Sequence, residues 1–151
     1  MVNEEAFRTA WKEIDALHCP FAKALLGGHG DCRHAQRHYL AERIGIGCRD
    51  AAHQAVCSAF IDGLRRDARF ALATTHASGG LPHGLAMKLQ VGGLRGLHRL
   101  LEREAVEGPV TDVVGLFVGV IERYGSLDGV PMTAIVQEVS HFIPRRPHGD
   151  R

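Results

Sequence analysis

Apolar side chains recur with the period of an α-helix along most of the N-terminal half of the chain. This pattern predicts four helices, at residues Glu4–Leu17, Pro20–Leu26, Cys32–Arg43 and Ala51–Thr75. Asn3, Asp31 and Asp50 precede three of them and are residue types that favour a helix N-cap. Pro20 suits the first turn of the second helix, which makes Cys19 its N-cap.

The C-terminal half continues the helical period in shorter segments that glycine and proline separate. It predicts helices over Gly84–Val91 and Leu94–Ala105, one that starts at Pro109 and ends at Gly125, and one that starts at Pro131 and stops at Pro144. Gly92 and Gly93 lie between the first two of these predicted helices and are expected to separate them. The sequence therefore predicts a single compact all-α domain of about six or seven helices over residues 1–144, followed by a polar tail over 145–151.

Composition and charge narrow the class of partner. The chain has 151 residues, enough for one domain, and its 18 basic and 17 acidic residues nearly balance. This balance disfavours nucleic acid and acidic membrane surfaces as partners. Glu4 and Glu5 lie where a secretory signal would carry basic residues, and the most apolar segment, Val110–Ile121, is too short to span a bilayer. We expect a cytoplasmic protein without a membrane partner.

The four cysteines are the strongest chemical signal, because all of them precede residue 58: Cys19, Cys32, Cys48 and Cys57. In a reducing cytosol this grouping favours a metal site over disulfides. Cys19 and Cys32 head two predicted helices, Cys48 precedes a third, and Cys57 lies on the inward face of that third helix. We expect the four thiolates to converge on one metal centre within residues 18–57.

An iron–sulfur cluster, preferably [4Fe–4S], is the expected cofactor. Such a cluster is anionic, and helix N-termini favour anions by roughly 0.3–1 kcal/mol each. No C-x-x-C pair is present, so the zinc-ribbon and bacterial ferredoxin spacings are not matched. Iron bound by four cysteines has no open position, which favours electron transfer or redox or iron sensing with a protein redox partner over catalysis.

Two alternatives to the cluster stay open. One is a zinc-stabilised helical adaptor without redox chemistry, and the other is a metal-free helical interaction module whose cysteines belong to the core. Two pairs four residues apart on predicted helices, His53 with Cys57 and His34 with His38, would suit a mixed zinc site. His18 and His53 are candidates for hydrogen bonding to the metal ligands.

Overall fold

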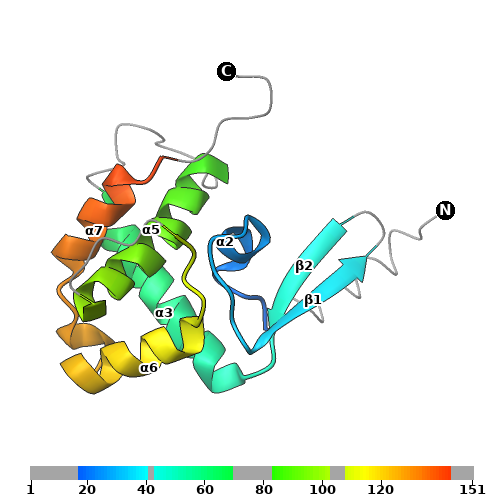
Figure 1. Cartoon of the computed structure of the whole chain (residues 1–151), viewed down its shortest axis with the longest axis horizontal. Coiled ribbons are helices and arrows are strands. Elements are labelled where there is room, and N and C mark those ends of the chain that lie inside the picture. Colours follow the sequence, from blue (N-terminus) through cyan, green and yellow to red (C-terminus); the bar gives the residue numbers. More distant parts are fainter. Residues whose placement is uncertain (1–16, 41–42, 70–82, 103–107, 144–151) are drawn as a thin grey trace.

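The computed structural model describes residues 17–40, 43–69, 83–102 and 108–143. Helices form one body, from which a β-hairpin extends (Figure 1). The elements are α2 (Ala22–Leu26), β1 (Ala35–Leu40), β2 (Arg43–Cys48), α3 (Ala51–Asp67), α5 (His83–Glu102), α6 (Val113–Tyr124), the 3-10 helix η1 (Leu127–Gly129) and α7 (Met132–His141). The fold is mostly helical, as predicted, but it is not all-α, and the described residues form five α-helices, fewer than expected. Nearly all of the predicted helix Glu4–Leu17 and the tail 145–151 lie outside the described residues.

The predicted helix over Cys32–Arg43 is wrong, because most of this stretch belongs to a β-hairpin. β1 and β2 pair antiparallel, with Ala35 opposite Cys48 at one end and Leu40 opposite Arg43 at the other. The helical spacing in this stretch rested on a few weakly apolar residues, which pairing with a neighbouring strand overrides.

Strand β2 has a sequence signal that the helical interpretation missed. Ile44 and Ile46 are β-branched and alternate with glycine, a period of two that suits a strand. The two glycines of β2, predicted to end a helix, lie inside the strand instead. The segment before α2 runs along β2, since Cys19 N–H donates to Ile46 O at 3.0 Å and Cys48 N–H donates to Leu17 O at 2.7 Å.

Helix α3 follows the hairpin directly and begins where the sequence predicts. The Asp50 side chain caps it by accepting a hydrogen bond from His53 N–H at 2.9 Å. Its inward face buries Cys57, Phe60, Ile61 and Leu64, as its apolar spacing indicates. The helix ends at Asp67, short of the predicted Thr75, and residues 70–82 lie outside the described part of the chain.

Helix α5 is continuous, so the predicted break at Gly92 and Gly93 is wrong. A Cβ atom at Gly92 would lie 2.5 Å from Val139 Cα on α7, and one at Gly93 would meet the side chains of Leu64 and Phe60 on α3. These glycines therefore allow close approach of two neighbouring helices. That packing offsets the roughly 1 kcal/mol that glycine costs inside a helix.

Helix α6 begins later than predicted, at Val113 and not at Pro109. The Asp112 side chain caps it by accepting from Gly115 N–H at 3.0 Å. Its end at Gly125 is confirmed: this residue has φ of +84° and donates its N–H to Ile121 O at 2.7 Å. The last helix, α7, follows Pro131 as predicted but already ends at His141.

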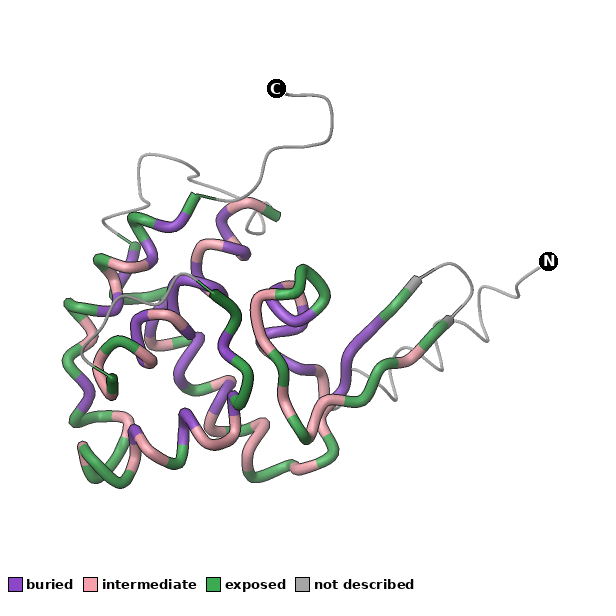
Figure 2. Tube along the Cα trace, in the orientation of Figure 1, coloured by how far each residue is buried: buried purple, intermediate pink, exposed green. Residues whose placement is uncertain are grey.

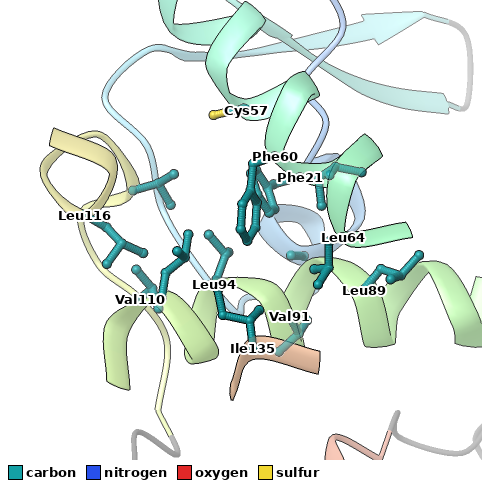
Figure 3. Packing of buried hydrophobic residues seen from close by; sticks show 14 of the residues in the cluster. Phe21, Cys57, Phe60, Leu64, Leu89, Val91, Leu94, Val110, Leu116 and Ile135 are labelled. Atoms are coloured by element: carbon teal, nitrogen blue, oxygen red, sulfur yellow. The ribbon is translucent and has the colours of Figure 1, made fainter. Parts of the chain in front are cut away.

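Buried residues line the inward sides of the helices (Figure 2). Three aromatic rings join α2, α3 and α6 within this core: Phe60 lies 6.3 Å from Phe21 and 5.5 Å from Phe117, measured between ring centroids. The Cys57 sulfur lies beyond Phe60 at the end of the core that faces the hairpin (Figure 3). The aromatic core thus packs next to the part of the fold in which the cysteines lie.

Candidate metal centre

The four cysteines come from four separate segments and line one pocket. Cys19 precedes α2, Cys32 precedes β1, Cys48 ends β2, and Cys57 lies in the second turn of α3. The pocket that all four line is bounded by the start of α2, the base of the hairpin and α3. None of the four is in a disulfide. The fold therefore brings together thiols that are up to 38 positions apart in the sequence.

The expected ring of helix amino ends around this site is wrong. Cys19 does not cap α2, whose N-cap is Phe21 and which has only five residues. Cys32 leads into a strand instead of a helix. Cys19 and Cys48 each lie three residues before a helix, but only α3, which follows Cys48, is longer than five residues. The dipoles of three helices therefore cannot supply the positive potential that the sequence suggested.

Backbone N–H groups supply part of the positive potential that helix N-termini were expected to provide. The N–H of Phe21 donates to the sulfur of Cys19, and the N–H groups of His34 and Ala35 donate to the sulfur of Cys32. Each of these hydrogen bonds lowers the pKa of the thiol that accepts it, because it favours the thiolate. Hydrogen bonds of this kind to ligand sulfurs also tune metal–thiolate centres.

Burial and mutual repulsion act in the opposite direction. Burial is the main cause that raises the pKa of Cys19 to about 12, and it also raises the pKa of Cys57 and of Cys32. Charge on one thiol raises the pKa of another in all six pairs that the four cysteines form. Each thiolate therefore opposes the ionisation of the other three, and a bound cation would offset this repulsion.

The rest of the pocket lining offers no such cation. Apart from the cysteines it consists of apolar residues and glycine, with His53 and Gln54 as the polar members. The pKa of His53 is lowered, first by burial and then by the nearby His34, so its imidazole stays neutral. The lining of the pocket therefore has no fixed positive charge that would balance the charge of the thiolates.

His53 faces the pocket, whereas His18 does not. The His53 Nε2 lies 3.5 Å from the Cys57 sulfur, and its ring centroid lies 5.4 Å from that of His34. His18 lines a neighbouring groove, and its backbone carbonyl accepts a hydrogen bond from Gln54. Of the two histidines proposed to support the metal ligands, His53 is the one that the fold places beside a cysteine.

The mixed zinc site from two helical pairs does not form. His53 and Cys57 share α3 as expected, but His34 precedes β1 and His38 lies within it, so the two are not on adjacent helical turns. His38 is not among the residues that line the pocket, and its Nε2 lies 3.1 Å from where a Cβ at Gly47 would be. His34 instead lies 3.9 Å from an Asp50 carboxylate oxygen.

Gln54 is the polar lining residue that the sequence did not single out. Its side-chain nitrogen donates to His18 O at 3.1 Å and to Ser58 Oγ at 3.2 Å. The bond to His18 O ties α3 to the segment that carries Cys19, whereas the bond to Ser58 lies within α3. The signal available in the sequence was its position three residues before Cys57, which places both side chains on the same face of the helix.

The free space among the thiols is small. The pocket holds about 10 Å³, room for about one water molecule. Among the described residues, no group of three or more histidine, cysteine, aspartate or glutamate side chains is placed to hold a metal ion. The sulfur atoms are therefore neighbours without forming a ready single-ion site, in which Zn–S bonds of 2.3 Å would set them about 3.8 Å apart.

In the part of the chain that the structure describes, no helix has the length and apolar character needed to cross a membrane. No protein-family model matches the sequence, and neither a curated protein nor a solved structure is significantly similar to it. The function must therefore be argued from the cysteine site.

Proposed function

We propose that Cys19, Cys32, Cys48 and Cys57 hold an iron–sulfur cluster, preferably [4Fe–4S], and that the protein acts in electron transfer or in redox or iron sensing. The observation that carries this proposal is the single pocket lined by four cysteines whose thiols are coupled in every pair. The thiols are free, which suits the reducing cytoplasm that we propose as the location.

The grouping of all four cysteines around one pocket, without a single-ion group in the described part of the chain, supports a cluster over one bound ion. In a cluster each cysteine binds a different iron, so the four sulfurs stand farther apart than ligands that share one ion. The described residues offer no single-ion group, although all four thiols surround the same space. The backbone N–H groups directed at Cys19 and Cys32 suit ligand sulfurs whose negative charge is shared with an anionic cluster.

A cluster needs more room than the pocket now has, and the hairpin can supply it. The hairpin carries Cys48, and Cys32 lies at its base. Farther out, Tyr39 is 69% exposed and Ile44 is 44% exposed, so these side chains resist displacement little. Cys57 is anchored on α3 next to the aromatic core. An outward shift of the hairpin would separate the sulfurs and leave the aromatic rings around Phe60 in place, although it would move Ile46, which is buried in the core.

Electron exchange suits this arrangement better than catalysis at the metal. Four cysteine ligands leave no iron open to a substrate. Cys19 and Cys57 are buried, whereas Cys32 and Cys48 are partly exposed, so a cluster would have one edge near solvent. A protein redox partner that approaches this edge would exchange electrons through the ligands on the hairpin side.

A zinc-stabilised adaptor domain is the second candidate, and the small free volume favours it. A single ion occupies about the space of one water molecule, so it would need a smaller rearrangement of the ligands than a cluster. Zinc would then fix the hairpin to the helices without redox chemistry, and loss of zinc would cost folding energy directly.

One experiment separates these candidates. The protein is purified without oxygen, and iron, acid-labile sulfide and zinc are measured on the same sample together with the visible and electron paramagnetic resonance spectra. The cluster proposal expects a brown protein with equal amounts of iron and sulfide. A colourless protein with one zinc selects the adaptor. A folded protein without metal, before and after anaerobic reconstitution, rejects both and leaves the cysteines as core residues.

Matched variants test the ligand assignment. Serine at each cysteine in turn should reduce iron and sulfide content to a small fraction of the wild-type value. Ala55→Ser is the control, because it adds the same hydroxyl to an exposed position of α3 two residues before Cys57. His53→Gln should keep the cluster and shift its midpoint potential by tens of millivolts, since hydrogen bonding near the sulfurs tunes the potential.

A further inference from the structure

The four cysteines divide into two pairs by their access to solvent. Cys19 is 8% exposed and Cys57 is 4% exposed, and both belong to the main core cluster. Cys32 and Cys48 are partly exposed. An oxidant that arrives from solvent therefore meets Cys32 and Cys48 first, and the other two only after the core opens.

The backbone holds Cys32 and Cys48 close together. Cys48 is directly opposite Ala35 in the hairpin register. Ala35 N–H in turn donates to Cys32 O at 3.0 Å, and Arg49 N–H donates to His34 O at 2.8 Å. Opposite residues of an antiparallel pair have Cα atoms about 4.5–5.5 Å apart, which places Cys48 beside Ala35, three positions after Cys32. One tight turn thus separates Cys32 from the cross-strand partner of Cys48, and both thiols line the same pocket.

We infer that Cys32 and Cys48 are an oxidation site of the metal-free protein and form a disulfide with a hydroperoxide as the oxidant. The inference rests on the proposed function, since it explains how a cysteine-held centre would sense oxidation. The disulfide removes two of the four ligands, so the metal centre cannot reassemble until the bond is reduced.

The chemistry balances in two steps. The thiolate of one cysteine attacks an oxygen of hydrogen peroxide; the O–O bond breaks, a sulfenic acid forms and, with a proton from solvent, water leaves. The thiolate of the other cysteine then attacks the sulfenic sulfur, the S–S bond forms and a second water leaves. In total, two thiols lose two electrons and two protons, and one peroxide becomes two waters. A dithiol reductant reverses the change.

Disulfide mapping tests this directly. The full-length protein is stripped of metal under reducing conditions, desalted without oxygen and treated with one equivalent of hydrogen peroxide. Remaining thiols are alkylated under denaturing conditions, and the peptides are identified by mass spectrometry. The expected product joins Cys32 to Cys48, with Cys19 and Cys57 alkylated. A main product that joins any other pair, or sulfinic acid without a disulfide, overturns the inference.

Variants and a kinetic measurement keep the test independent of folding defects. Cys19→Ser should still give the Cys32–Cys48 disulfide, whereas Cys48→Ser should leave a sulfenic acid on Cys32 that dimedone traps. In the native wild-type protein, iodoacetamide should modify Cys32 and Cys48 at least about tenfold faster than Cys19 and Cys57, because exposure governs access. Equal rates for all four would overturn the inference even if a variant failed to fold.

Reconstitution separates this inference from the proposed function. Oxidised protein should take up no iron and sulfide, and treatment with dithiothreitol should restore uptake. If reduced protein takes up neither iron nor zinc, the proposed metal centre fails, whatever the disulfide map shows. If reduced protein assembles a centre but peroxide joins a different pair, the metal centre stands and the assignment of Cys32 and Cys48 fails.

Discussion

The helical body and the β-hairpin are stabilised in different ways. In the body, Leu64 on α3, Leu94 on α5 and Ile135 on α7 are fully buried. Outer positions of the hairpin are open to solvent, with Tyr39 at 69% and Ile44 at 44% exposure. The body is therefore stabilised mainly by burial of apolar surface, whereas the hairpin relies on backbone pairing and on its base, where Ile46 is buried in the core and the cysteines lie.

This difference predicts how each region responds to perturbation. Changes in the apolar core should unfold the whole domain, because the helices share one hydrophobic cluster. Loss of a bound metal should loosen the hairpin first, since a two-stranded hairpin is marginally stable by itself. The following tests run from the largest expected effect to the smallest.

Phe60→Ala should have the largest effect on the body. The ring is 2% exposed and contacts the rings of Phe21 and Phe117, so its loss leaves a cavity between α2, α3 and α6. We expect the free energy of unfolding to fall by about 4 kcal/mol, measured by urea denaturation with far-ultraviolet circular dichroism. Ile143→Ala removes an 82% exposed side chain and should change it by less than about 0.5 kcal/mol. Equal losses of unfolding free energy for the two variants would mean that the aromatic cluster does not determine the stability of the helical body.

Gly92→Ala should destabilise the body by about 3 kcal/mol, near the upper end of overpacking effects. The added Cβ would lie 2.5 Å from Val139 Cα, so α5 and α7 must separate. Gly84→Ala is the matched control on the same helix, because a Cβ there meets nothing within 4 Å. That variant should be neutral or stabilising by up to about 1 kcal/mol. Similar losses for both would show that helix propensity, and not close packing, governs this interface.

Metal removal should separate the hairpin from the body. Hydrogen exchange is followed by mass spectrometry on protein with its metal and after chelation. Amides of β2 should exchange about tenfold faster without metal, a loss of roughly 1.4 kcal/mol of local stability. Amides in the middle of α5 should change less than about twofold. A uniform increase across both regions would contradict the division between them, and no increase anywhere would place the metal outside this site.

The same division marks what the sequence could predict. Helices α3 and α7 begin where caps and apolar spacing indicate, because their buried faces repeat with the helical period. The hairpin was missed, since Cys32, Ala35 and Tyr39 mimic a helical stripe and only the pairing of β1 with β2 decides the outcome. The continuity of α5 depends on contacts from α3 and α7 that no local pattern contains.

The sequence indicated that the four cysteines share one place in the fold, but not how that place is built. Grouping of all four cysteines in one segment suggested a shared site, and the fold does place them around one pocket. The expected helix amino ends were wrong, because Cys32 leads into a strand and α2 starts after Cys19. The hydrogen bonds from backbone N–H groups to Cys19 and Cys32 depend on local turns that spacing alone does not reveal.

The smallest expected effect lies at Asp50, the residue that joins the hairpin to the body. The N–H of His53 is the main cause that lowers the pKa of the Asp50 carboxyl in the folded protein. A lowered folded pKa means that the carboxylate stabilises the protein above the unfolded value of about 3.9. This stabilisation is lost as pH falls through the lower folded value.

Asp50→Ala should therefore lower the melting temperature slightly at neutral pH, with less difference from wild type in acid. Asp50→Asn keeps a capping oxygen, and it should lose mainly the acid-dependent part. If thermal melts give Asp50→Asn the same acid dependence as wild type, the charge at this junction does not stabilise α3.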